Sequence, residues 1–120
     1  MALQRGSLGF STMIGAGTTV SVLTVGSAQT CYVKSILLYN HSSTSVNNVK
    51  VHFVENAGGS AGVANSENLL ARIGLQADDT FFFEPAYPIT LTSNGDTIQV
   101  YNEGTVAANT NVLVLGDKEV

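Results

Sequence analysis

The sequence predicts an all-β fold, an antiparallel β-sandwich or jelly roll of about eight strands with an extended N-terminal arm. Short runs rich in Val, Ile, Thr, Tyr and Phe recur along the chain, separated by clusters of Gly, Ser, Asn and Asp. Several runs alternate apolar and polar side chains, which is typical of strands with one buried face. No segment demands a helix, and 120 residues is the length of one domain.

The first 17 residues differ from the rest and are expected to form the arm. Glycines and small residues surround isolated large apolar side chains, with no steady period of two or 3.6. Either this arm packs on its own domain or it docks on a partner. Its candidate partner contacts are Leu3, Arg5, Leu8 and Phe10. The expected organisation is therefore an arm over residues 1–17 and a sandwich over residues 18–120.

Eight strands are expected in the sandwich. In the first, apolar residues change face, which predicts a bulge near Val22. In the third, Val49, Val51 and Phe53 are expected to point inward, and the residues between them outward. The connection over residues 55–67 is rich in Gly, Ala and Ser, so its tip is expected to be mobile. The expected ranges are residues 18–25, 31–40, 48–54, 68–73 and 80–84, two strands within 88–102, and residues 110–115.

The two strands within residues 88–102 are expected to form a hairpin. Asn94-Gly95 would lie at its tip in a type I′ turn, because both central residues of that turn need positive φ. In this register Leu91 lies opposite Ile98, and both lie on one face. Residues 103–109 are expected to close the next hairpin.

Three of the predicted strands are apolar on both faces. In residues 31–40, the expectation places Val33, Leu37 and Tyr39 on one side and Ile36 and Leu38 on the other. Residues 110–115 alternate in the same way, and residues 80–84 hold the aromatic run Phe81, Phe82 and Phe83. A sandwich has one inner face per sheet, so the arm, a loop or another copy must cover the second apolar face.

This surplus of apolar surface predicts a homo-oligomer or a larger assembly. Phe82 is expected to face opposite to Phe81 and Phe83, with one side of the strand in the core and the other between subunits. Charged residues make up only 12% of the chain, and charges are depleted at the cores of interfaces.

The charge and hydropathy of the chain limit the kinds of partner and the cellular compartment that we expect. The net charge is −4 and only five residues are Lys or Arg, so binding of nucleic acid by phosphate neutralisation is not expected. There is no apolar run of about 18 residues, so no membrane partner is expected. The N-terminus shows no signal peptide, and synthesis in a cytoplasm is expected. Cys31 is expected to be a small buried hydrophobe.

No catalytic, cofactor or metal site is expected. His41 and His52 lack neighbouring ligand residues, and Asp78-Asp79 lacks the alternating oxygen ligands of a calcium loop. No serine lies in a nucleophile-elbow context. The four tyrosines either line a sugar-binding surface or pack in the core and between subunits.

The order of several segments resembles a class of small tailed-bacteriophage virion proteins. The run YVKSILLYNHSS is followed by a Val-rich strand, a Gly-rich loop, FFFEPAYPITLTSNGDTIQVYNEG and a final NVLVLGDKE. Residues 33–40 carry a V-K-S-I-x-L-x-N pattern, and Gly-Asp-Thr-Ile follows at residues 95–98. The resemblance covers roughly residues 18–117 and leaves the arm outside.

Within that class, the resemblance favours capsid decoration (cement) proteins. The resemblance implies a β-sandwich, often a homotrimer, that binds the major capsid protein on the outside of the phage head and stabilises the shell. It also implies a virion protein made in the host cytoplasm, with no catalytic residues. Two alternatives remain open: a neck, tail or fibre component that binds a receptor or glycan, and a cellular carbohydrate-binding or pilus-like module.

Overall fold

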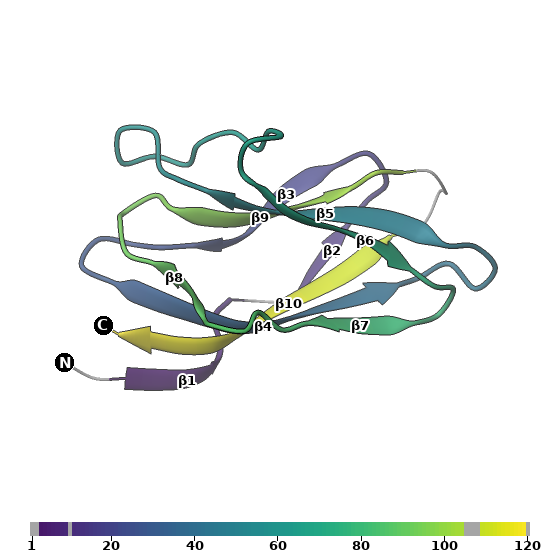
Figure 1. Cartoon of the computed structure of the whole chain (residues 1–120), viewed down its shortest axis with the longest axis horizontal. Helices are drawn as coiled ribbons and strands as arrows, with labels where there is room; N and C mark the ends of the chain where they lie inside the picture. The colour runs from purple at the N-terminus through teal and green to yellow at the C-terminus, as the bar shows by residue number, and fades with distance from the viewer. Residues whose placement is uncertain (1–2, 10, 105–108, 120) are drawn as a thin grey trace.

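A computed structural model of the chain describes residues 3–9, 11–104 and 109–119. All regular secondary structure in these ranges is β, in two antiparallel sheets that face each other (Figure 1). The described part of the chain has no helix long and apolar enough to cross a membrane. The strands are β1 (Leu3–Ser7), β2 (Thr12–Ile14), β3 (Thr19–Thr24), β4 (Thr30–Asn40), β5 (Asn47–Val54), β6 (Leu69–Leu75), β7 (Thr80–Phe83), β8 (Ile89–Leu91), β9 (Thr97–Asn102) and β10 (Thr110–Glu119).

The strand order is that of a jelly roll. In sheet A, β10 and β4 lie side by side, β1 and β2 both pair with β10, and β7 and β8 both pair with β4. Sheet B has the order β3-β9-β5-β6. If β1 with β2 and β7 with β8 are each taken as one interrupted strand, eight strand positions result, four in each sheet. The predicted all-β sandwich of jelly-roll type is therefore confirmed.

The segment expected to be an arm forms one edge of sheet A. Strand β1 pairs with the C-terminal half of β10, and β2 pairs with its beginning, so the described chain ends lie close together (Figure 1). Leu8 and Ile14 are buried in the core. Of the two alternatives left open by the sequence, packing on its own domain is the one observed.

The prediction of a hairpin over residues 88–102 is wrong. Strand β8 belongs to sheet A and β9 to sheet B, so the chain crosses between the layers at the turn. Leu91 and Ile98 are both fully buried, as the alternation predicted, but they belong to opposite sheets. Only Gly95 of the Asn-Gly pair has positive φ, at 93°, which fits a type II turn and not type I′. The alternation alone did not distinguish neighbours in one sheet from strands facing across the core.

The second expected hairpin is also wrong, because β9 and β10 lie in different sheets. Other local expectations are confirmed. The ladder between β3 and β9 shifts register between Ser21 and Leu23, which is the bulge expected near Val22. On β5, Val49 and Val51 are fully buried, and Phe53 packs against the core.

Strand β4 departs from strict alternation. Its register with β10 shifts between Leu115 and Gly116, so Val33 turns inward and lies on the same side as Ile36 and Leu38. The expectation that Val33 shares a face with Leu37 is therefore wrong. Leu37 and its neighbours on the outer side remain half-buried.

One end of the sandwich is closed by buried polar side chains. Asn47 donates to Asn102 Oδ1 at 2.9 Å and to Thr110 Oγ1 at 3.2 Å, and Asn102 donates to the Ile14 carbonyl at 3.1 Å. These bonds join strands of both sheets. Asn40 donates to three backbone carbonyls, those of Ser45, Leu75 and Gln76. The amide nitrogens of Asn40, Asn47 and Asn102 are thus satisfied within the core, whereas Oδ1 of Asn47 is buried without a hydrogen-bond partner among the described residues.

Candidate functional site

The outer surface of sheet A carries a continuous apolar row. Leu113 pairs with Leu37, and Leu37 pairs with Phe82, so the three side chains lie side by side across β10, β4 and β7. Phe82 is 54% exposed. We call this surface the A face and define it by Met13, Leu37, Tyr39, Phe82, Leu113 and Leu115. Such adjacent apolar side chains on a surface indicate an interaction site.

The next row of the A face is more polar. Asn111 pairs with Tyr39, and Tyr39 pairs with Thr80. The Tyr39 hydroxyl donates to Asp78 at 3.0 Å, and this hydrogen bond, aided by burial and the negative charge of Asp78, raises the pKa of Tyr39. The tyrosine ring also meets His41 edge-on, at 4.9 Å between centroids. Tyr39 is therefore held in place on the A face, and one wall of a hollow of about 220 Å³ is fixed.

A small group of charged side chains borders the A face beyond Leu115. Asp117 on β10 is 2.7 Å from Lys34 and 3.7 Å from Arg5, so one carboxylate has two cations beside it. The side chains of Lys34 and Arg5 remain largely exposed. The Asp117 side chain is only 11% exposed, so the two cations compensate a largely buried carboxylate. The group forms a hydrated border to the apolar row.

The structure separates the residues that the sequence analysis took as one contact set. Leu3 is 49% exposed, and Arg5 is exposed on the same edge strand. Leu8 is in the core, so it is not available to a partner. Phe10 lies outside the described residues. Because β1 pairs with β10 and β7 pairs with β4, the arm residues and the aromatic run lie at opposite edges of sheet A.

The aromatic run is less buried than expected. Phe81 is 41% exposed although it pairs with the buried Leu38, and only Phe83 packs against the core. Strand β7 has four residues and lies at an edge, so one of its flanks has no neighbouring strand. The expectation that this run has one fully buried side is therefore wrong at Phe81. Phe82, by contrast, points to the outer side as expected.

The outer surface of sheet B has charged and polar residues where sheet A has leucines. Arg72 pairs with Lys50, and Lys50 pairs with Tyr101. Glu103 accepts two hydrogen bonds from Arg72, at 2.9 and 2.8 Å, and lies 3.6 Å from Lys50. These contacts raise the pKa of Arg72 and, through its hydrogen bonds and charge, lower the pKa of Glu103. We call this row, defined by Lys50, Arg72, Tyr101 and Glu103, the B face.

The loop over residues 55–67 is fastened to the sandwich. Asp96 accepts hydrogen bonds from both the backbone and side-chain nitrogens of Asn56, at 2.9 and 3.0 Å. Gln99 donates to the Gly62 carbonyl at 3.1 Å, and Asn94 donates to the Gly59 carbonyl at 3.3 Å. The expectation of a mobile tip did not take these bonds into account. The recurrent Asn residues, which cap turns well, were the available signal.

Gly95 fixes where this loop approaches the turn between β8 and β9. A Cβ at that position would lie 2.8 Å from backbone atoms of Gly59. Positive φ and this close approach both require glycine there. The loop therefore lies against the turn, beyond the ends of β9 and β5 (Figure 1).

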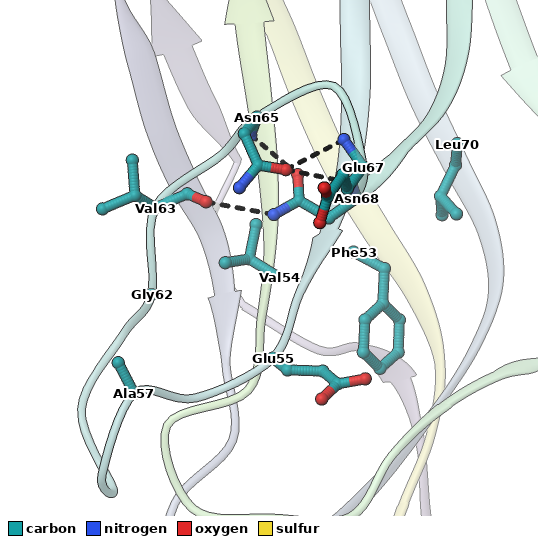
Figure 2. Close-up of a pocket in the computed structure, with 10 residues that line it drawn as sticks. All are labelled: Phe53, Val54, Glu55, Ala57, Gly62, Val63, Asn65, Glu67, Asn68 and Leu70. Atoms are coloured by element: carbon teal, nitrogen blue, oxygen red, sulfur yellow. Dashed lines mark hydrogen bonds between the residues drawn. The ribbon is translucent and has the colours of Figure 1, made fainter.

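A pocket of about 580 Å³ opens between this loop and the strands β5 and β6 (Figure 2). Its walls combine apolar side chains with two carboxylates. The lining residues are Phe53, Val54, Glu55, Ala57, Gly62, Val63, Asn65, Glu67, Asn68 and Leu70. The sequence patterns did not predict this pocket.

Across the described ranges, no three His, Cys, Asp or Glu side chains gather as a metal site. Cys31 is buried, as expected, and this burial raises the pKa of its thiol. His52 points to the outer side of sheet B, yet it is only 5% exposed. Its Nδ1 lies 2.8 Å from Oδ1 of Asn68, so it serves to fasten the loop.

Comparisons with known proteins give a distant structural likeness. No protein-family model and no curated protein matches the chain. Among solved structures, the chain is similar to a mutant VP2 protein of infectious bursal disease virus, described in its derived T=1 particles. The TM-score is 0.38, with 6% sequence identity over 98% of this chain. The chain spans 30% of the length of that VP2 chain.

Proposed function

We propose that this chain is a virion structural protein, namely a capsid decoration (cement) protein of a tailed phage. It would bind the outside of the head as a homo-oligomer, with a trimer as the expected state, and act without catalysis. In this proposal the A face joins neighbouring copies. The major capsid protein is the second partner, and the site of action is the head surface.

The observation that carries the proposal is the row Leu113, Leu37 and Phe82 on the A face. These side chains keep exposed apolar surface on a strand layer whose other side already forms the core. Complete burial of one such side chain stabilises by about 1.5–3 kcal/mol. Because Leu37 and Leu113 are already half-buried and Phe82 is 54% exposed, a second copy that covers this row would gain part of that energy for each side chain.

Two further features support the same proposal. The low charge of the chain suits a surface that is covered by subunits. The segment order resembles cement proteins, whose mechanism is the addition of many equal contacts around a shell. Weak contacts of one subunit then act together as avidity.

Co-sedimentation of the purified chain with mature capsids that lack it tests the proposal. We expect saturable binding at a fixed ratio to the capsid protein, and the ratio identifies the symmetry positions that are filled. The well-folded chain remaining in the supernatant at all concentrations would contradict the cement role.

A neck, tail or fibre-associated adsorption protein is the second candidate. The observation that favours it is the fastened loop over residues 55–67 with its pocket, since a preformed loop lowers the entropy cost of binding. This candidate predicts binding to host cells or purified surface glycans in the absence of capsids. A pull-down with whole cells separates it from the cement role.

A further inference from the structure

The pocket at the 55–67 loop has walls of two chemical kinds. Val63 is 80% exposed, Leu70 is 46% exposed, and the half-buried Phe53 adds an aromatic ring. The carboxylates of Glu55 and Glu67 are exposed in the same pocket. In the view of Figure 2, Glu67 lies near the top of the pocket and Glu55 near the bottom, with Val54 and Phe53 between them.

The negative charge of this pocket has no counter-ion from the described part of the chain. Arg5 and Lys34 pair with Asp117, and Lys50 and Arg72 pair with Glu103. None of the ion pairs among these residues includes Glu55 or Glu67. Among the described residues, the pocket therefore presents two carboxylates without an ion-pair partner beside apolar walls.

Hydrogen bonds within the loop preform the rim of the pocket. Asn65 Oδ1 accepts hydrogen bonds from the backbone nitrogens of Glu67 and Asn68, at 2.9 and 3.2 Å (Figure 2). Asn68 returns one bond by accepting from the Asn65 backbone, and it donates to the Val63 carbonyl at 3.0 Å. Because the loop is already ordered, less conformational entropy is lost on binding.

We propose that this pocket receives an arginine side chain presented by a partner protein. The aliphatic stem of arginine would lie along Val63 and Leu70, as long cationic side chains do on apolar surfaces. The guanidinium would reach the carboxylates and stack on the face of the Phe53 ring, which is the combination that it binds well. Lysine fits less well, because its ammonium is more strongly hydrated. A metal ion gains nothing from the apolar walls.

This inference rests on the proposed function for the identity of the partner, which is the major capsid protein. The N-terminal segment no longer serves as a free grip, since Leu8 lies in the core and residues 3–7 pair with β10. The pocket lies by the strands of sheet B, away from the A face that joins the copies. One subunit can therefore contact its copies and the capsid through different surfaces.

The first test needs no capsid. Nα-acetyl-arginine amide is titrated into the isotope-labelled chain and followed by amide chemical shifts, with the neutral isostere Nα-acetyl-citrulline amide as the matched ligand. We expect saturable shifts at residues 62–70 with arginine only. Equal shifts with citrulline, shifts spread over other acidic sites, a stronger response to calcium chloride, or no shifts at all would each overturn the proposal.

Charge-removing variants give the second test. Glu55→Gln and Glu67→Gln should each weaken arginine binding roughly fivefold, the size of one exposed ion pair. Glu84→Gln, an exposed acid outside the pocket, should leave binding unchanged. Equal weakening in all three variants would show a non-specific charge effect and contradict the site.

Co-sedimentation with capsids then links the pocket to the proposed function. If the wild-type chain binds capsids and the double variant Glu55→Gln/Glu67→Gln does not, the pocket is the capsid contact. Arginine binding without capsid binding would keep the pocket and remove the cement role. Capsid binding that is equal for wild type and double variant would keep the cement role and overturn the pocket as its contact.

Discussion

The A face and the B face occupy equivalent places on the two sheets and differ in chemistry. Across sheet A the row reads Leu113, Leu37 and Phe82. Across sheet B it reads Arg72, Lys50 and Tyr101, with Glu103 bound to both cations. On the B face both cations pair with Glu103 of the same subunit, whereas on the A face Phe82 is 54% exposed among the described residues. The two outer surfaces of the sandwich therefore differ in the partners that they can bind.

The largest effect on stability is expected at β4, where the neighbouring residues Leu37 and Leu38 point to opposite sides of the sheet. Leu38 is fully buried, so Leu38→Ala should lower the free energy of unfolding by about 2–5 kcal/mol. Leu37→Ala, the same change on the A face, should cost a dissociated subunit much less. Urea unfolding at low protein concentration measures both, and equal losses would contradict the assignment of Leu37 to an outer face.

Phe82→Asp should weaken self-association while the subunit remains folded. Loss of one buried apolar side chain, about 1.5–3 kcal/mol, corresponds to roughly 10- to 100-fold weaker association per contact. Native mass spectrometry reads the assembly, and circular dichroism reads the fold. Tyr87→Asp is the matched control, because Tyr87 is an aromatic residue with 85% exposure outside the A face. Equal loss of assembly in the control would remove the role of the A face.

Asp96→Asn should loosen the fastened loop and cost about 1–3 kcal/mol of stability. Asp96 accepts from both nitrogens of Asn56 and from the Ser93 backbone, and an amide cannot accept at both of its ends. Hydrogen exchange should speed up over residues 55–67 and remain slow in sheet A. Unchanged exchange in the loop would show that these bonds do not hold it.

Acidification should destabilise the folded protein through the carboxylates of Asp96 and Glu103. Burial raises the pKa of Asp96, but hydrogen bonds from Asn56, Ser93 and Thr92 outweigh it, so its pKa lies below the ordinary value of 3.8. Hydrogen bonding and charge from Arg72 lower the pKa of Glu103 below 4.5. A lowered pKa in the folded state stabilises above the unfolded value and is lost as the pH falls through the folded one.

Thermal unfolding between pH 6 and pH 2 measures the direction in which stability changes with pH. This range extends about two units on either side of ordinary carboxyl pKa values. The melting temperature should fall as the pH drops below about 4.5, and Asp96→Asn should reduce that fall. A melting temperature that rises on acidification would contradict the assigned direction of both shifts.

The smallest effect is expected from Arg72→Ala on the B face. The pair with Glu103 is exposed on the arginine side, so its loss should change stability only slightly and self-association not at all. Sedimentation velocity against wild type measures the association. Dissociation of the oligomer by this variant would place the B face in the interface and reverse the comparison.

The sequence predicted the strands well because side-chain alternation and turn residues are local signals. Every expected strand has a counterpart, and the bulge near Val22 follows from a visible change of face. Strands β1 and β2 were not predicted, because they lie in the segment expected to be an arm. Which strands pair was predicted poorly. Leu91 and Ile98 carry the same pattern whether they lie in one sheet or face each other across the core. Topology depends on contacts between distant residues, which alternation does not encode.

The candidate surfaces likewise include features that the sequence predicted and features that it did not. The two-sided apolar character of β4 and β10 was readable, and Leu37 and Leu113 are indeed left on the outer side. The burial of Leu8 was not readable, because it depends on pairing of the N-terminal segment with the last strand of the chain. The pocket at the 55–67 loop likewise depends on bonds to Asp96 and Gln99, more than 30 residues away.

The most direct test of the central claim is the reactivity of one introduced cysteine on each face of the assembled protein. Thr80→Cys borders the A face and Thr19→Cys borders the B face, and both threonines are exposed in the single subunit. The buried Cys31 contributes a slow background. We predict that alkylation at position 80 slows as the protein concentration rises and the copies assemble, while position 19 stays reactive. Equal reactivity of the two positions at every concentration would contradict the claim that copies cover the A face.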